Sequence, residues 1–214
     1  MVITFYYGSG SPYTWRVWFA LEHKEIAYDI QLMSFNDGDL KKPEFLAINP
    51  RGKVPTIVDN GFVLSESAAI LEYLEQSRPD SGKPLFPGDA QDQAMVRSKV
   101  CEADNYYAPA MNKLVAGVLF TKPEDWNEER IAAARGQCLE ELGRVAAAMR
   151  GDFLAGALSA ADFALYPMLA ICLRCDVRKP GLTLAAALPP EISAWVARMQ
   201  ALPYYARTRP AHWT

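Results

Sequence analysis

Two serines stand where a hydroxyl can meet the exposed N–H groups of a helix. Ser11 precedes Pro12 and a run of apolar residues at helical spacing, and Ser67 follows Glu66 at the start of a later apolar stripe. Free N–H groups and the positive end of the helix dipole attract anions, so the Glu66-Ser67 pair could hold a carboxylate. The spacing alone also fits two ordinary helix caps, because a serine before proline caps a helix without any ligand.

The sequence offers few candidate residues for thiol or metal chemistry. Cys172 and Cys175 have redox or metal-ligand spacing, but they lie near a predicted helix end with no second pair, which indicates an incidental spacing. His23 and His212 are far apart in the sequence, so zinc sites and histidine triads lack candidate ligands, and we expect no metal. A thioredoxin-like oxidoreductase would need a cysteine where Ser11 stands.

The first 78 residues predict the order β-α-β-α-β-β-α. A run of β-branched and aromatic residues over 2–7 predicts a buried strand, and a helix follows from Ser11 to about Lys24. Asn60-Gly61 between two apolar runs favours a type I′ turn and therefore a hairpin. The remaining elements are a strand over 28–32, a short helix over 43–48 and a helix that begins at Glu66.

The rest of the chain predicts a helical domain. Residues 79–88 are rich in proline and glycine, which is typical of a linker, and no convincing strand follows them. We therefore predict an α/β domain over 1–78, a linker over 79–88 and an all-α domain over 89–214. Ser159 and Asp162 fit a structural capping box. The helical patterns cover about 92–119, 127–149, 159–172 and 191–202.

Charge and composition limit the function classes. The chain of 214 residues carries 22 basic and 25 acidic side chains, and this net charge of −3 disfavours nucleic acid as a partner. No apolar stretch reaches the roughly 18 to 20 residues of a membrane span, and the N-terminus lacks the basic region of a signal peptide. The four sparse cysteines fit a reducing compartment, so we expect a cytoplasmic protein without a membrane partner.

Four local motifs, in their order and spacing, resemble the cytosolic glutathione S-transferases, above all the bacterial-type and serine-dependent theta, zeta, tau and delta branches. The resemblance covers essentially the whole chain. It implies a thioredoxin-like domain with a mixed four-stranded sheet, followed by an all-helical domain. It also implies a homodimer that uses glutathione as co-substrate. The motifs are Ser11–Val17 (SPYTWRV), Asn49–Pro55 (NPRGKVP), Leu64–Ile70 (LSESAAI) and Ser159–Asp162 (SAAD).

The resemblance implies that Ser11 is catalytic. A thiol with a pKa near its reference value of about 8.5 is mostly protonated at neutral pH, and a hydroxyl that donates to the sulfur at a helix N-terminus stabilises the thiolate. The activated glutathione would then attack a small hydrophobic electrophile. Ser9 is a second candidate for the donor. Other branches of the family use a tyrosine at the end of the first strand, which leaves Tyr6 or Tyr7 open.

The same resemblance implies a peptide site for glutathione. Glu66 would contact the α-amino group and Ser67 the carboxylate of the γ-glutamyl part. A cis bond before Pro55 would aim the backbone of Val54 at the cysteinyl part, as in an added strand. The cationic candidates for the glycine carboxylate are Lys53, Lys42 and Lys41.

The electrophile and the reaction type stay open at this point. A cis-trans isomerase of the zeta type is one alternative, although the zeta motif has Ser-Ser-Cys where this chain has Ser11-Pro12-Tyr13. A non-catalytic glutathione-binding or protein-interaction module of the same fold is another. The joint presence of a thiol activator and a complete peptide site favours an enzyme. The expected wall of the electrophile site comprises Tyr13, Trp15, Tyr106, Tyr107, Met111 and Leu114.

Overall fold

Strands and helices alternate only in the first part of the chain. The computed structural model describes residues 2–213, which fall into two units. The first unit comprises the residues up to Phe86 together with those from Pro203 onward, and the second comprises Pro87–Leu202. No helix within residues 2–213 is both long and apolar enough to cross a membrane.

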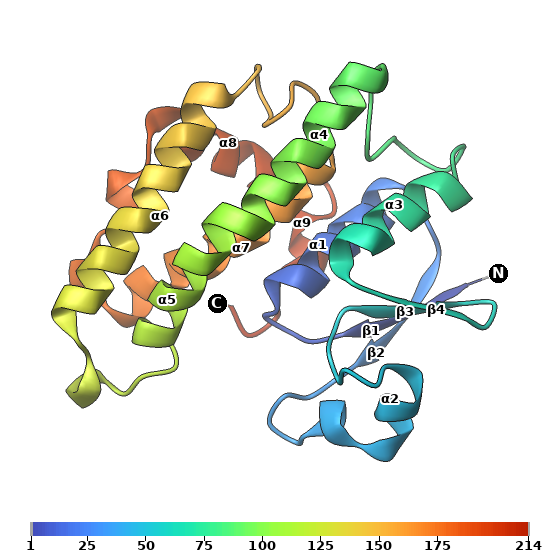
Figure 1. Cartoon of the computed structure of the whole chain (residues 1–214), viewed down its shortest axis with the longest axis horizontal. Coiled ribbons are helices and arrows are strands. Elements are labelled where there is room, and N and C mark those ends of the chain that lie inside the picture. Colours follow the sequence, from blue (N-terminus) through green and yellow to red (C-terminus); the bar gives the residue numbers. More distant parts are fainter. Residues whose placement is uncertain (1, 214) are drawn as a thin grey trace. The chain divides into compact units, whose positions relative to one another are not determined.

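The first unit has a mixed four-stranded sheet with the strand order β2-β1-β3-β4 (Figure 1). β1 and β2 pair in parallel, whereas β1–β3 and β3–β4 pair antiparallel. This arrangement confirms the predicted βαβαββα order and the thioredoxin-like fold class. The elements are β1 (Ile3–Tyr7), α1 (Pro12–His23), β2 (Tyr28–Leu32), η1 (Asp39–Lys41), α2 (Pro43–Ile48), β3 (Thr56–Asp59), β4 (Phe62–Ser65), α3 (Ser67–Ser77) and α9 (Tyr205–Thr208).

Side-chain periodicity explains how these elements form one core. Alternate residues of β1 are buried, with Phe5 fully buried and opposite Ile57 of β3 in the antiparallel register. Asn60 and Gly61 both have left-handed φ values, 53° and 83°, and they join β3 to β4 in a two-residue turn. The predicted hairpin is therefore confirmed.

The end of the chain differs from the sequence-based expectation. The sequence pattern predicts that residues after 202 belong to the helical domain. In the structure, the segment from Pro203 onward instead packs against α1 of the first unit. The indole Nε1 of Trp15 donates to the buried Thr208 Oγ1 at 3.0 Å, and the ring of Trp213 lies edge-on to Trp15 at 5.4 Å. These contacts join residues far apart in sequence, and the short α9 has no long helical pattern that would reveal them.

The second unit is helical, as predicted. Apart from isolated bridges near Phe153–Gly156, the described residues of this unit form no strand. The single helix expected over 92–119 is divided by a π-helical turn, and the helix expected to end near Cys172 continues to Arg178. The elements are α4 (Ala90–Glu102), η2 (Ala103–Tyr107), α5 (Ala108–Val118), η3 (Pro123–Asp125), α6 (Glu128–Ala148), α7 (Ala160–Arg178), η4 (Pro180–Leu182), η5 (Ala185–Ala187) and α8 (Pro190–Gln200).

A buried carboxyl group organises the start of α7. Ser159 and Asp162 form the predicted capping box, and the Asp162 side chain is fully buried. Its carboxylate oxygens accept from the backbone N–H groups of Leu154 and Ser159, each at 3.0 Å, and from Trp195 Nε1 of α8 at 2.8 Å. Burial raises the pKa of Asp162 to about 6 although these hydrogen bonds lower it, so the carboxylate is the main form at neutral pH. Asp162 thus ties α7, α8 and the preceding loop together.

Replacing Asp162 by asparagine should destabilise the protein strongly. An amide has one acceptor oxygen and adds an NH2 donor, so at least one buried N–H loses its partner, at a cost of about 3 kcal/mol. Urea unfolding followed by circular dichroism measures the loss. Asp92 provides the matched control, because it occupies the same position in the exposed capping box of α4. Asp92→Asn should cost about 1 kcal/mol or less, and equal losses in the two variants would contradict the structural role of burial.

His23 should make stability depend on pH. Burial, with help from Lys83 and Lys24, lowers the pKa of His23 from its ordinary 6.5 to about 4. Between these values the unfolded chain binds a proton that the folded chain does not, so the stability present above pH 6.5 declines as the pH falls toward 4.

The comparison with His23→Gln isolates this effect. Between pH 7.5 and 4.5, wild type should lose up to about 3 kcal/mol more free energy of unfolding than the variant. Titration of Asp162 is common to both proteins and cancels in the difference. Parallel pH profiles from urea unfolding would show that His23 is protonated in the folded state.

Candidate functional site

The loop between β1 and α1 presents Ser11 at the start of the helix. Gly10 has a left-handed φ of 87°, and Ser11, which is partly exposed, is the N-cap of α1. Ser11 Oγ accepts from the Thr14 N–H at 3.4 Å, and the Thr14 hydroxyl is directed at the carbonyls of Gly8 and Ser11, each at 2.9 Å. Since Ser11 Oγ acts as an acceptor in the cap, its own hydrogen is available for a ligand.

The other candidate donors lie in different surroundings. Tyr7 is buried, its hydroxyl donates to Ser9 Oγ at 3.5 Å, and burial raises its pKa. The Tyr7 phenol therefore stays protonated at neutral pH. Tyr6 points to the opposite face of β1, where its ring lies 5.5 Å from that of Phe45 in α2. The structure brings Tyr7 and Ser9 together on the strand and loop before Ser11, and separates Tyr6 from them.

The start of α3 has the strained backbone that often marks a functional position. Glu66 is exposed and has a φ of 69°, a conformation that costs free energy in a residue with a side chain. Ser67 is almost fully buried, and its Oγ accepts from Arg16 Nη1 of α1 at 3.1 Å. This hydrogen bond joins α1 to the start of α3, and Figure 1 shows the two helices on the same side of the sheet.

The loop before β3 approaches the loop before α1. The Val54–Pro55 peptide bond is cis, as the resemblance implied. A Cβ on Gly8 would lie only 2.8 Å from Val54 Cγ2 and 2.5 Å from Phe35 Cζ, so a larger residue there would displace the ends of these side chains. Gly8 therefore allows the backbone that leads to Ser11 to pack against the loop that carries the cis-proline.

Two of the three candidate lysines, Lys53 and Lys42, differ in how they are engaged. The Lys53 side chain is exposed, and its backbone carbonyl accepts from Asn49 Nδ2 at 2.9 Å and from Thr56 Oγ1 at 3.0 Å, which fixes the loop. Lys42 is also exposed but forms an ion pair with Asp39 at 2.5 Å. Lys53 is thus the better-placed of the two for a new anionic partner.

Several residues of the expected electrophile wall belong to hydrophobic cores instead. Trp15 is 1% exposed and stacks on Phe19 within the first unit, and Leu114 and Met111 are buried within the second. These side chains have almost no surface to offer a substrate, because helical spacing of aromatic and Met residues marks core as readily as pocket. Tyr13 keeps a partly exposed ring, with the Arg16 guanidinium 5.4 Å from its centroid.

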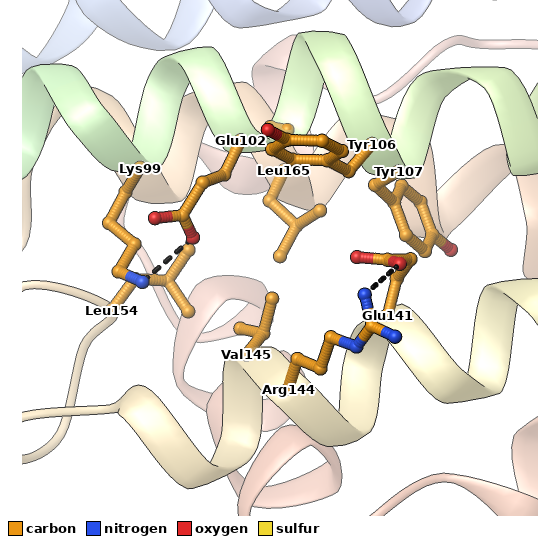
Figure 2. Close-up of a pocket in the computed structure, with 10 residues that line it drawn as sticks. Lys99, Glu102, Tyr106, Tyr107, Glu141, Arg144, Val145, Leu154 and Leu165 are labelled. Carbon is orange, nitrogen blue, oxygen red and sulfur yellow. Dashed lines mark hydrogen bonds and ion pairs between the residues drawn. The ribbon is translucent and has the colours of Figure 1, made fainter.

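Tyr106 and Tyr107 line a cavity inside the second unit. This cavity of about 230 Å³ lies beside the π-helical turn, with Tyr106 exposed and Tyr107 buried (Figure 2). Two ion pairs border it, Lys99–Glu102 at 2.7 Å and Arg144–Glu141 at 3.1 Å. The cavity is made of residues from the second unit alone and includes none of the predicted glutathione-binding residues.

The paired cysteines are unsuited to thiolate chemistry. Cys172 and Cys175 are fully buried, and burial raises the pKa of Cys172 well above its ordinary value and that of Cys175 to about 12. Both thiols stay protonated at neutral pH, in agreement with an incidental spacing. Across residues 2–213, no group of three or more His, Cys, Asp or Glu side chains is arranged to hold a metal ion.

Comparison with known proteins agrees with the fold and the motifs. Residues 10–77 match the family "Glutathione S-transferase, N-terminal domain", and residues 128–198 match "Glutathione S-transferase, C-terminal domain". Glutathione S-transferase A of Pleuronectes platessa is 32% identical over 193 residues, which cover 85% of this chain and 84% of that protein. The chain belongs to the glutathione S-transferase family.

One relative of this chain is named for a different activity. Probable maleylacetoacetate isomerase 2 of Drosophila melanogaster is 32% identical over 163 residues, 74% of this chain and 69% of that one. Among solved structures, a glutathione S-transferase from the Antarctic clam Laternula elliptica superposes with a TM-score of 0.80 at 30% identity. That match covers 100% of this chain and 94% of the clam protein.

Sequence reasoning missed two groups at this site. Arg16 belongs to the first motif, but nothing in its spacing indicated that its guanidinium would reach Ser67 of α3. His212 lies at the far end of the sequence, yet its Nδ1 is 3.1 Å from Ser9 Oγ. Both depend on contacts between distant parts of this glutathione S-transferase, for which a single sequence carries no signal.

Proposed function

We propose that this protein is a glutathione transferase in which Ser11 activates the glutathione thiol for attack on a small hydrophobic electrophile. The observation that carries the proposal is the partly exposed Ser11 hydroxyl at the N-terminus of α1. Its oxygen is occupied by the Thr14 N–H, which leaves its hydrogen for the sulfur. A thiolate at this point also meets the positive end of the helix dipole.

The surrounding residues suit the two ends of the peptide. We infer that Ser67 and the free N–H groups at the start of α3 hold the γ-glutamyl carboxylate, with Glu66 on the α-amino group. The positive charge of Arg16, hydrogen-bonded to Ser67 Oγ, supports an anion there. The backbone of Val54, beside the cis bond to Pro55, pairs with the cysteinyl part. Lys53, and less directly Lys42, offers charge to the glycine carboxylate.

In the proposed reaction the nucleophile is the glutathione sulfur, and Ser11 only stabilises its anionic form. The hydroxyl hydrogen stays on Ser11 and stabilises the thiolate, while the thiol proton goes to solvent. The thiolate then forms a carbon–sulfur bond to the electrophile, either with loss of a leaving group or with protonation of the adduct. Of the predicted wall, Tyr13, which belongs to the same unit as Ser11, keeps exposed surface for an apolar substrate. A homodimer and a cytoplasmic location remain part of the proposal.

A glutathione-dependent cis-trans isomerase is the second candidate. The relative in Drosophila that carries the name of a maleylacetoacetate isomerase supports it. In that reaction the thiolate adds to a carbon–carbon double bond, the single bond formed rotates, and elimination returns glutathione. Pro12-Tyr13 in place of the Ser-Cys of the zeta motif counts against this activity. A panel of haloarene, epoxide and cis-enedione substrates distinguishes the two, because only isomerisation leaves the glutathione concentration unchanged.

Ser11→Ala should raise the thiol pKa of bound glutathione. In wild type we expect this pKa to lie about two units below the reference value for a thiol, because a hydrogen bond and the helix dipole favour the anion. Ultraviolet thiolate absorbance against pH measures it, and the variant should approach free glutathione. Tyr6→Phe is the control, because Tyr6 lies on the opposite face of β1 against Phe45, and it should leave the value near that of wild type. An unshifted pKa in wild type would falsify the catalytic proposal and favour a non-catalytic binding module.

Ser67→Ala should weaken glutathione binding by about tenfold, which corresponds to about 1.4 kcal/mol. The variant removes the hydroxyl at the start of α3 and the acceptor of Arg16. Isothermal titration calorimetry measures the affinity, and thermal unfolding checks that the fold persists. Ser77→Ala is the matched control, because Ser77 is an exposed serine at the opposite end of the same helix. Equal affinities for the two variants would remove Ser67 from the site.

A further inference from the structure

The last part of the chain places a histidine on the loop that precedes Ser11. His212 is exposed, and its Nδ1 lies 3.1 Å from Ser9 Oγ. The imidazole also lies against Gly10, since Nε2 is 3.2 Å from the position that a Cβ on Gly10 would occupy. The family motifs in this sequence do not include His212, although it contacts the loop between β1 and α1.

Buried neighbours hold His212 in this place. Trp213 is 8% exposed, and its ring lies edge-on to Trp15 of α1 at 5.4 Å. Its backbone N–H donates to the carbonyl of Pro210 at 2.9 Å, which closes the turn around His212. Thr208, earlier in the same segment, accepts from Trp15 Nε1. The histidine is therefore presented by an anchored turn.

We propose that His212 is a positioning residue of the thiol site that acts through Ser9. Protonation of its imidazole makes Ser9 a second hydrogen-bond donor to the glutathione thiolate, beside Ser11. This inference rests on the proposed function and adds to it a control of the thiolate by the C-terminal segment.

The hydrogen-bonding capacity of Ser9 gives the reason. A protonated imidazole donates from both ring nitrogens, so Ser9 Oγ must accept from Nδ1. Tyr7, protonated at neutral pH because burial raises its pKa, donates to the same oxygen at 3.5 Å. With both acceptor positions of Ser9 engaged, its hydrogen is directed to a third group, and the thiolate that we propose at Ser11 can accept it. In a neutral ring, Nδ1 can instead accept the Ser9 hydrogen.

The other ionisable groups on the elements packed around His212 would not mimic the protonation of its imidazole. Glu22 is ion-paired with Arg207 at 2.9 Å, and the pKa of His23 lies near 4. As residue types, tyrosine and arginine do not change their charge between about pH 5 and 8, where an ordinary histidine does. Besides His212, the ionisable side chains on β1, α1 and the C-terminal segment are those of Tyr6, Tyr7, Tyr13, Arg16, Glu22, His23, Tyr204, Tyr205, Arg207 and Arg209.

A titration of the histidines by NMR in the full chain tests the coupling. The protein has only two histidines, and the low pKa of His23 separates its signal from that of His212. Binding of glutathione should raise the pKa of His212 by about half a unit or more, because coupling between two ionisations is reciprocal. S-methylglutathione has the same charged ends but no ionisable thiol, and it should leave the pKa of His212 unchanged.

Variants separate this role from a structural one. Ser9→Ala should raise the thiol pKa of bound glutathione by about half a unit and reduce the response of His212 to glutathione. His212→Phe should make the thiolate absorbance follow a single uncoupled ionisation. Arg209→Gln, which removes a charge from the same segment without touching Ser9, is the matched control and should behave as wild type.

The outcomes distinguish this inference from the proposed function. If glutathione and S-methylglutathione shift His212 equally, or if Ser9→Ala changes neither pKa, His212 has no role at the thiol and the inference is wrong. Those results can coexist with a low thiol pKa that depends on Ser11, which would leave the transferase proposal intact. A thiol pKa that is unshifted in wild type would instead overturn the transferase proposal and this inference with it.

Discussion

The buried hydrogen bond between Arg16 and Ser67 is the interaction on which the arrangement of the site depends. It joins α1 to the first residue of α3, two elements separated by most of the first unit in sequence. Helix N-termini carry partial positive charge and unsatisfied N–H groups. Through this contact the first residue of α3 meets a positively charged side chain of α1. A net charge of −3 gives no hint of this local positive field.

Close packing of two loops completes the arrangement. The absence of a side chain at Gly8 lets Val54 and Phe35 approach the backbone that leads to Ser11. A Cβ there would displace the ends of the Val54 and Phe35 side chains, which are both at least partly exposed. The loop before α1 and the loop before β3 therefore meet at a contact that the small size of Gly8 permits.

The C-terminal segment, from Pro203 onward, covers the side chain of Trp15 in the first unit. Trp213 and Thr208 are buried and contact Trp15, a residue that the sequence predicts in the wall of a substrate pocket. The burial of Trp15 explains why the sequence-based interpretation misplaced both this residue and the end of the chain. A large aromatic residue on α1 is covered by the chain's own end, so it belongs to the core, and the segment that covers it belongs to the first unit.

Local patterns in the sequence determined the elements and the motifs. The alternation in β1, the Asn60-Gly61 turn and the Ser159–Asp162 capping box depend on neighbours within a few residues, and the structure confirms each of them. The cis bond before Pro55 followed from the family resemblance. Only the tertiary structure decided which helical stripe is core, and that Arg16 reaches Ser67 and His212 reaches Ser9. Such contacts arise when distant elements pack, and periodicity along a chain records which face is apolar but not what covers it.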